Sequence, residues 1–251
     1  MVGGMGGNQS WKQALYESYV SSGQAGPAAA SALEQFRPRR AYLRWVIRRL
    51  FPADRGARIL DIGCGHGALL YFLREAGYAN LAGVDSSPEQ VALAHTFGIE
   101  SVACGDAMAF LQQQPAHSAQ VICLFDVLEH LDRQELFDLL AEVRRVLVPG
   151  GSCIGHVPNA AGLFGMRIRY GDLTHEQAFT ATSLRQAFRS LGFTRVDYLE
   201  DKPVVHGPTS LVRRVLWEAG SLPFRLLLAA ESADRQALLS QNLLFRADLP
   251  S

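Results

Sequence analysis

The sequence predicts an α/β fold built on a parallel, doubly wound β-sheet. Two observations support this class. First, five short apolar segments alternate with segments whose apolar residues recur at helical spacing, the order of a parallel sheet with crossover helices. Second, the first apolar segment runs into three glycines at alternate positions, Gly63, Gly65 and Gly67, as expected where a chain turns sharply from strand into helix.

Each element of this core follows from local patterning. Ser87 is placed to cap a helix whose first position is Pro88, and residues 149–151 (PGG) predict the turn into the fifth strand. The expected strands are short, apolar and bounded by turn residues: 58–62, 81–84, 100–104, 120–125 and 152–157. The expected helices between them are 68–76, the one that opens at Ser87, 108–113 and 135–146.

Further helical segments flank this core. Residues 11–51 form an expected N-terminal helical cap with helices over 11–22 and 28–51, the second broken near Pro38. An irregular stretch, 159–179, precedes a helix and a strand, 182–191 and 193–199. Residues 203–240 are an expected helical insertion, interrupted at Gly220 and Pro223, before a last strand at 243–247. No repeat or linker divides the chain, so we expect one domain over residues 1–251.

Composition narrows the classes of partner and compartment. The 251 residues carry 24 basic and 24 acidic side chains, a net charge of zero, which disfavours dedicated binding to nucleic acid. The four cysteines show no C-x-x-C pair and lie in or beside apolar runs, as reduced thiols of a cytoplasmic protein do. The first ten residues show no apolar signal region, and no stretch is long and apolar enough to be a transmembrane segment.

The strongest chemical signal is the glycine-rich turn with Asp85 at the end of the next strand. The glycines allow a ligand to approach the backbone closely, and Asp85 is placed to accept hydrogen bonds from two ribose hydroxyls. The same spacing satisfies a loose dinucleotide fingerprint. Asp61, two residues before the first glycine, argues against a dinucleotide, because a carboxylate there would repel the pyrophosphate. It would attract the ammonium and sulfonium groups of S-adenosylmethionine.

Residues 58–158 resemble class I S-adenosylmethionine-dependent methyltransferases. Five motifs occur in the family's order and spacing: residues 60–67 (LDIGCGHG), 83–85 (GVD), 105–106 (GD), 126–130 (DVLEH) and 147–151 (LVPGG). The resemblance implies a Rossmann-like methyltransferase fold with a mostly parallel seven-stranded sheet that ends in an antiparallel hairpin of residues 193–199 and 243–247. The cofactor-binding core would be residues 57–158.

The resemblance also implies a set of cofactor contacts. Asp61, Gly63, Cys64 and Gly65 would lie at the methionine end and Asp85 with Ser86 at the ribose. Asp106 and Ala107 would lie at the adenine, although Asp106 is equally placed to cap the helix it precedes. Phe125 and Asp126 would border the methyl group.

A second cluster surrounds the motif that follows the fourth strand. Asp126, Glu129 and His130, with the distant His175, offer two carboxylates and two imidazoles, a set suited to Mg, Mn, Fe or Zn. The set is similar to that of small-RNA 3′-end methyltransferases and, in part, to that of metal-binding ubiquinone-pathway O-methyltransferases. Asp126 stands where the first of these families has Glu, which shortens the reach. Without a metal, His130 or His175 would act as the catalytic base.

These features predict methyl transfer from S-adenosylmethionine to a small-molecule acceptor, with the hydroxyl of a sugar or natural product as the expected target. The chain resembles bacterial enzymes of secondary-metabolite and surface-polysaccharide pathways. Two alternatives stay open: a metal-dependent RNA 3′-end 2′-O-methyltransferase, and a non-catalytic partner subunit with the same fold. The helix around Arg213 and Arg214 is amphipathic and could pack as a solvated face, close over an acceptor as a lid, or make a peripheral membrane contact.

Overall fold

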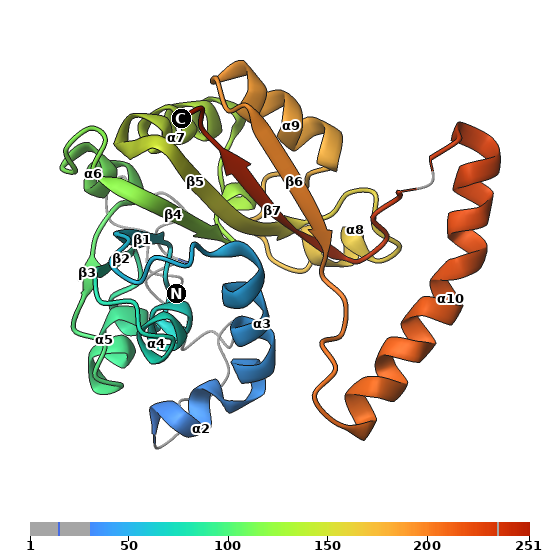
Figure 1. The fold of residues 1–251 in the computed structure, drawn as a ribbon, viewed down its shortest axis with the longest axis horizontal. Helices are drawn as coiled ribbons and strands as arrows, with labels where there is room; N and C mark the ends of the chain where they lie inside the picture. Colours follow the sequence, from blue (N-terminus) through green and yellow to red (C-terminus); the bar gives the residue numbers. More distant parts are fainter. Residues whose placement is uncertain (1–14, 16–30, 235) are drawn as a thin grey trace, which may run out of the picture.

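The computed structural model describes residue 15, residues 31–234 and residues 236–251. Seven strands form one sheet in the order β3-β2-β1-β4-β5-β7-β6 (Figure 1). The expected helix over residues 11–22 falls almost wholly outside the described residues. The strands are β1 (Ile59–Ile62), β2 (Leu81–Asp85), β3 (Val102–Cys104), β4 (Ala119–Phe125), β5 (Leu147–Pro158), β6 (Arg195–Glu200) and β7 (Asn242–Asp248).

The first five strands run parallel, and β7 runs antiparallel to both of its neighbours, β5 and β6. This arrangement confirms the expected doubly wound sheet with a late antiparallel hairpin. Every residue of β1 is buried, because β1 lies between β2 and β4 and helices cover both faces of the sheet. A strand buried on both faces is apolar throughout, so Asp61 within β1 is an exception that a function must explain.

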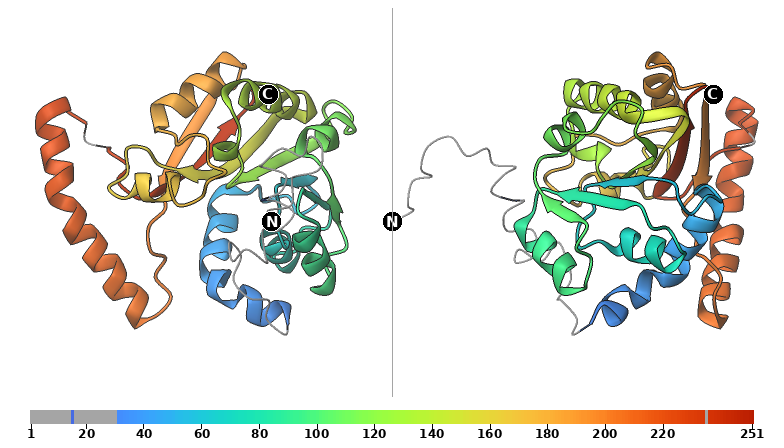
Figure 2. Two further views of the ribbon diagram at one scale, coloured as in Figure 1. Left: turned by 180° about the vertical axis from the view of Figure 1, so that it is seen from behind. Right: turned by 60° about the vertical axis from the view of Figure 1, so that its left-hand side comes forward.

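Helices cover the two faces of the sheet, and each face has its own apolar core (Figure 2). Side chains of α3 (Arg40–Leu50), α4 (Ala68–Glu75) and α5 (Pro88–Thr96) pack on one face. Those of α6 (Ala107–Gln112), α7 (Arg133–Val146) and α9 (Ala181–Ser190) pack on the other. Ser87 caps α5, and Asp132 and Glu135 form a reciprocal capping box at the start of α7.

The segment before β1 breaks at the expected proline. A short helix, α2 (Ala32–Phe36), passes through a 3-10 turn, η1 (Arg37–Arg39), into α3. The side chain of Phe36 is 1% exposed, and α3 buries Leu43, Val46, Ile47 and Leu50. These helices are therefore part of the hydrophobic core.

Two expectations about secondary structure were wrong in detail. β5 extends back through the expected turn at residues 149–151, where a register shift lets Leu147 pair with Ala119 and Ser152 with Val121. The insertion forms one continuous helix, α10 (Pro208–Ser232), although Pro223 lies inside it. Pro223 removes a single helical hydrogen bond. Ser221 donates to the Glu218 carbonyl within α10, and two residues after the proline Arg225 binds Glu200 and the Ala237 carbonyl, which anchors the helix to the molecule.

α10 lies along one side of the molecule, outside the helices that cover the sheet (Figures 1 and 2). A short helix, α8 (Gly165–Arg169), lies in the irregular segment after β5. Within the described chain, no helix combines the length and apolarity needed to cross a membrane.

Candidate active site

The predicted site residues gather at one edge of the sheet. The parallel strands β1, β2, β4 and β5 all end there, and the strand order reverses between β1 and β4. Ligands of open α/β sheets bind at such a reversal, outside the carboxyl ends of the strands. The topology alone therefore brings the glycine-rich turn after β1 next to Asp85 and the segment after β4.

The three glycines of the turn have different roles. All three adopt left-handed backbone angles, with φ of 68°, 55° and 80° at Gly63, Gly65 and Gly67. A Cβ on Gly63 would lie 2.6 Å from Val127, and one on Gly67 would lie 2.7 Å from Ile99, so these two glycines permit close packing. A Cβ on Gly65 would meet only Gln90, at 3.8 Å. Gly65 is thus the position where space is left for a ligand.

Asp61 is a buried carboxylate with no basic side chain beside it among the described residues. Its side chain is 2% exposed, and burial, followed by the negative charge of Asp85, raises its pKa to about 8. Cys64, the next predicted contact, packs over Gly83, and burial raises the pKa of its thiol. A cation placed beside Asp61 would stabilise the ionised carboxylate, so the site suits an ammonium group.

Asp85 connects the glycine turn to the next helix. One carboxylate oxygen accepts a hydrogen bond from the Gly65 amide at 2.7 Å and the other from the Ser87 amide at 2.9 Å. Burial raises its pKa, and these two amides oppose the increase. Each oxygen keeps a lone pair, which can accept from a ribose hydroxyl, and Ser86 beside it is exposed.

Asp106 does cap the helix that it precedes. Its Oδ1 accepts a hydrogen bond from the Ala109 amide at 2.9 Å at the start of α6. The side chain is exposed, and Ala107 beside it is partly buried. The cap uses one oxygen of the carboxylate, so capping and a contact with adenine through the other oxygen are compatible.

At the end of β4 the structure forms a chain of three charged groups that the sequence did not reveal. Phe125 stacks against His156, with ring centroids 6.3 Å apart. His156 Nδ1 donates to Asp126 at 2.5 Å, and Nε2 donates to Asp201 at 3.1 Å. Burial alone would lower the pKa of His156, but the charges of the two carboxylates and their hydrogen bonds raise it to about 10. His156 is therefore an imidazolium at neutral pH.

This chain separates Asp126 from the other proposed metal ligands. Glu129, His130 and His175 offer three ligand atoms that lie within 4.8 Å of one another, and Asp126 does not belong to this group. The carboxylate of Asp126 instead binds His156, whose positive charge and hydrogen bond lower the pKa of Asp126. Of the four expected ligands, the structure brings three together and leaves Asp126 outside the group.

Hydrogen bonds between backbones bring His175 to His130. The amides of Glu176 and Gln177 both donate to the carbonyl of Glu129, in the 3-10 turn η2 (Leu128–His130). The rings of His130 and His175 then lie 4.7 Å apart at a steep angle. The long segment after β5 is in this way held against the segment after β4.

Both imidazoles have their tautomer set by a neighbour. His175 Nδ1 donates to the Ile168 carbonyl at 3.0 Å. His130 Nδ1 contacts Thr174 Oγ1 at 2.8 Å, and that hydroxyl donates to Asp172 at 2.6 Å, so the ring must be the donor. In the neutral form of either ring, Nε2 is then the nitrogen without a proton. Such second contacts are typical of histidines that bind metals.

Glu129 completes the cluster. Its side chain is 1% exposed, and Oε2 has no hydrogen-bond partner among the described residues. Burial, followed by the charge of Asp126, raises its pKa well above the usual range. A buried carboxylate oxygen without a partner is costly unless a proton or a cation compensates it.

A cavity of about 480 Å³ opens beside the carboxylate of Asp201. Three elements contribute to its wall: Tyr42 from α3, Trp217 from α10, and Phe164 from the segment after β5. The hydroxyl of Tyr42 is buried beside the carboxylate of Asp201. Its pKa is raised by burial and then by the charges of Asp201 and Asp126. The cavity therefore offers aromatic surface together with polar groups.

Asp201, His156 and Tyr42 were not predicted as a group. The register of the sheet places His156 directly beside Phe125 on the neighbouring strand. The expected ends of these two strands, near residues 125 and 157, could have suggested that proximity. Asp201 follows β6 and Tyr42 lies on α3, and no sequence motif links either residue to His156 or Asp126.

The fold and the site together define a class I S-adenosylmethionine-dependent methyltransferase. Residues 33–198 match the family model described as a methyltransferase domain, about two thirds of the chain, and the chain belongs to this family. A solved S-adenosylmethionine-dependent methyltransferase from Archaeoglobus fulgidus superimposes with a TM-score of 0.64 and 25% identity, over 86% of this chain and 97% of that one.

Curated relatives match over shorter segments. A ubiquinone biosynthesis O-methyltransferase of Xylella fastidiosa is 35% identical over 102 residues, which are 38% of this chain and 39% of the relative. One from Xanthomonas axonopodis pv. citri is 31% identical over 129 residues, 48% of this chain and 52% of the relative. The chain thus matches about half or less of the length of these relatives.

The different surroundings of the glycines generate a first prediction. Gly65→Ala adds a methyl group where space is left for a ligand, so affinity for S-adenosylmethionine should fall at least tenfold with a small loss of stability. Gly67→Ala drives its methyl group into Ile99, so it should destabilise the fold by about 1–3 kcal/mol. Calorimetry and thermal unfolding measure both effects. Adding Ile99→Val to Gly67→Ala should restore part of the stability, and equal effects of the two alanines on stability would contradict the assignment.

The raised pKa of His156 generates a second prediction. Because the folded-state pKa lies above the unfolded value, the imidazolium stabilises the fold fully below pH of about 6.5 and ceases to do so as pH rises through about 10. Near pH 6 the free energy of unfolding of the wild type should therefore exceed that of His156→Asn by up to about 3 kcal/mol. The difference should shrink towards pH 10. Denaturant titrations across this range measure it, and a constant difference would refute the ion-pair interpretation.

Proposed function

We propose that this chain transfers the methyl group of S-adenosylmethionine to a hydroxyl of a small-molecule acceptor, a sugar or a natural product. One observation carries the proposal: a buried carboxylate and a glycine-rich turn lie at the strand reversal of the sheet, with a polar and aromatic cavity near the end of β4. The names of the curated relatives support oxygen as the atom that accepts the methyl group.

The geometry of the site supports the following set of cofactor contacts. Asp61 binds the ammonium group, the backbone from Gly63 to Gly65 passes beside the methionine, and Asp85 with Ser86 binds the ribose. Asp106 and Ala107 contact the adenine, and Phe125 with Asp126 borders the reacting methyl group. The donor supplies a methyl group already activated by its sulfonium, so the protein has mainly to align the acceptor for displacement and to exclude water.

The acceptor occupies the cavity beside Asp201. Tyr42 and Trp217 offer aromatic surface for a planar ring or the apolar face of a sugar, and Asp201 and Lys202 offer polar contacts. α3 and α10 then cover the acceptor, as expected for the helical cap and the insertion. His156 holds Asp126 and Asp201 in place through both ring nitrogens.

Glu129, His130 and His175 fit a divalent metal ion such as Mg, Mn, Fe or Zn. The buried Oε2 of Glu129 has no partner among the described residues, and both imidazoles have their Nδ1 engaged, so that Nε2 is the nitrogen that either ring in its neutral form would offer to a metal. A bound divalent metal would polarise an acceptor hydroxyl and lower its pKa.

The basicity of His130 favours this role over that of a general base. Burial, then the charge of His175, lowers the pKa of His130 to about 4. The imidazole is then neutral at pH 7 and accepts a proton weakly. A general base works best with a pKa near the working pH, so His130 is better suited to bind a metal than to remove a proton.

The raised pKa of Asp61 generates a test of cofactor binding. At pH 7 a carboxyl group with a pKa of about 8 is mostly protonated, and pairing with an ammonium group requires ionisation. Binding of S-adenosylmethionine should therefore release close to one proton, and affinity should fall up to tenfold per pH unit below 8. Calorimetry in buffers of different ionisation enthalpy measures the release.

Asp61→Asn should release no proton at this position and bind S-adenosylmethionine about tenfold to a hundredfold more weakly, because a charge-assisted hydrogen bond is lost. Asp138→Asn, at an exposed aspartate on α7, is the matched control and should release the same number of protons as the wild type. Equal release by the wild type and Asp61→Asn would refute the assignment.

The metal generates a further prediction. Mn²⁺ titration followed by electron paramagnetic resonance should show one site, which Glu129→Gln and His175→Ala abolish. Thr174→Val should weaken it about tenfold to a hundredfold because His130 loses the contact that orients it. Asp138→Asn, on the exposed face of α7, should leave the site unchanged.

The same variants test the reaction. Release of S-adenosylhomocysteine is followed with a panel of phenolic and sugar acceptors. Chelation should stop turnover, Mn or Mg should restore it, and the affinity for S-adenosylmethionine should stay constant. Full turnover by the chelated enzyme, with no Mn²⁺ bound, would show that the site works without a metal.

A further inference from the structure

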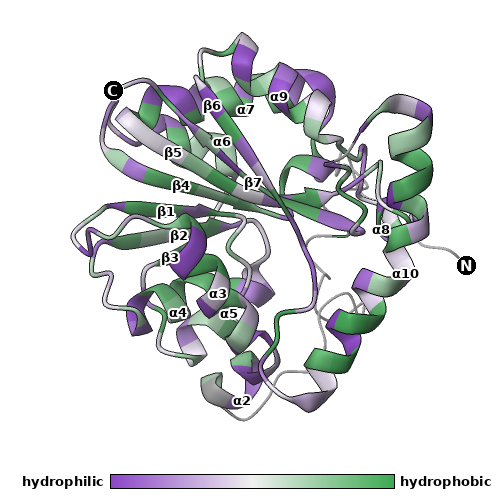
Figure 3. Cartoon of the chain, turned by 45° about the vertical axis from the view of Figure 1, so that its right-hand side comes forward, coloured by the Kyte–Doolittle hydropathy of each residue, from purple (hydrophilic) through white to green (hydrophobic). Residues whose placement is uncertain are grey.

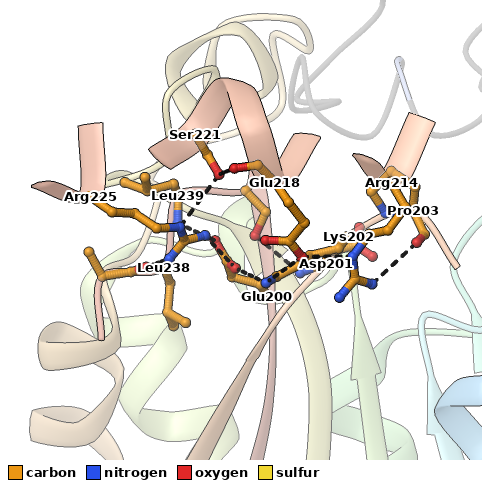
Figure 4. A network of polar contacts seen from close by, with 12 residues as sticks. Glu200, Asp201, Lys202, Pro203, Arg214, Glu218, Ser221, Arg225, Leu238 and Leu239 are labelled. Atoms are coloured by element: carbon orange, nitrogen blue, oxygen red, sulfur yellow. Dashed lines mark hydrogen bonds and ion pairs between the residues drawn. The ribbon is translucent and has the colours of Figure 1, made fainter. Parts of the chain in front are cut away.

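The long helix α10 turns its polar side chains toward the molecule and its apolar side chains toward solvent, the opposite of an ordinary surface helix. Its polar residues face the molecule (Figure 4). Arg225 binds both carboxylate oxygens of Glu200, at 2.6 and 2.7 Å, and donates to the carbonyl of Ala237. Ser210 and Ser221 are buried. Polar contacts, rather than an apolar core, therefore hold α10 to the rest of the molecule.

The outward face of α10 is apolar along almost its whole length (Figure 3). Leu216 is 66% exposed and Leu227 is 67% exposed. At about 100° per residue these side chains cover an arc of about 160° and a length of about 29 Å, with no charged residue among them. We call this face the outer stripe; its exposed members are Leu211, Val212, Val215, Leu216, Ala219, Leu222, Pro223, Leu226, Leu227 and Ala230.

An exposed apolar surface of this size indicates a binding partner, because monomeric proteins rarely leave such patches in water. The charges at the border of the outer stripe distinguish between partners. Arg213 and Glu231 lie on the same border, about five turns apart, and neither forms an ion pair with a described residue. A helix that binds anionic lipid carries an excess of Lys and Arg on its flanks, whereas this border carries one charge of each sign.

We propose that α10 pairs antiparallel with α10 of a second copy of this chain, about a two-fold axis near Leu222. Arg213 and Glu231 are equally far from Leu222 in opposite directions along the helix. Antiparallel pairing therefore places Arg213 of each copy beside Glu231 of the other, and the ion pair occurs twice, as an isologous interface requires. The same pairing covers both outer stripes with each other.

Pairing would also affect the cavity beside Asp201. Ser210, Arg213 and Trp217 of α10 line that cavity, and α10 reaches the molecule through the polar contacts of its inward face. A second copy on the outer stripe would hold this wall in one position. The pairing itself does not depend on which acceptor the cavity takes.

The proposal is tested by the mass of the full chain in solution, measured by light scattering and sedimentation at micromolar concentration. The wild type should have twice the 27.5 kDa of one chain. Leu222→Glu brings two carboxylates together near the axis and should give a monomer. Phe137→Glu replaces an apolar side chain on α7 that is 40% exposed, and this control should stay a dimer. Circular dichroism and thermal unfolding show that each variant is folded.

Charge reversal tests the direction of pairing. Arg213→Glu and Glu231→Arg should each weaken self-association by about tenfold, and the double variant should recover the affinity of the wild type. A monomeric wild type, a Leu222→Glu dimer, or failure of the double variant to recover would each overturn the proposal. So would a monomer that sediments with phosphatidylglycerol vesicles through Leu222, since the outer stripe would then bind lipid.

Discussion

The site depends on a carboxylate held out of water at the end of a strand that is buried on both faces. β1 is closed in by β2 and β4, and Asp61 is the one polar side chain within it. Its ionised form is costly until a cation arrives. The glycine-rich turn and Asp85 lie beside Asp61 at the strand reversal, and the segments after β4 and β5 begin at the same edge of the sheet.

The parts of the fold that were predictable are those encoded by short-range patterns. The strand-to-helix turn at Gly63, the cap at Ser87 and the apolar spacing of α7 each follow from a few adjacent residues, and the structure has all three. The continuity of α10 through Pro223 was not predictable, because the contacts of Arg225 with Glu200 and Ala237, on distant segments, anchor the helix just after the proline.

The site shows the same division. Asp61 and Asp85 belong to two successive motifs on neighbouring strands, and their proximity was evident from the sequence. His156 joins Asp126 to Asp201 across two strands and the end of a third, and only the order of β4, β5, β7 and β6 makes that contact possible. The cluster at Glu129 was half evident: the adjacent pair is a motif, but the approach of His175 depends on backbone hydrogen bonds to the Glu129 carbonyl.

The position of β7 has a consequence for biosynthesis. β7 is the last strand in chain order, yet it lies between β5 and β6, and in the described chain β6 has no other neighbour in the sheet. While a ribosome is still making residues 242–248, β5 has an open edge and β6 has no partner. Until residues 242–248 emerge, β5 and β6 are both exposed to incorrect strand pairing. We therefore expect this half of the sheet to fold slowly and to be the part most prone to aggregation.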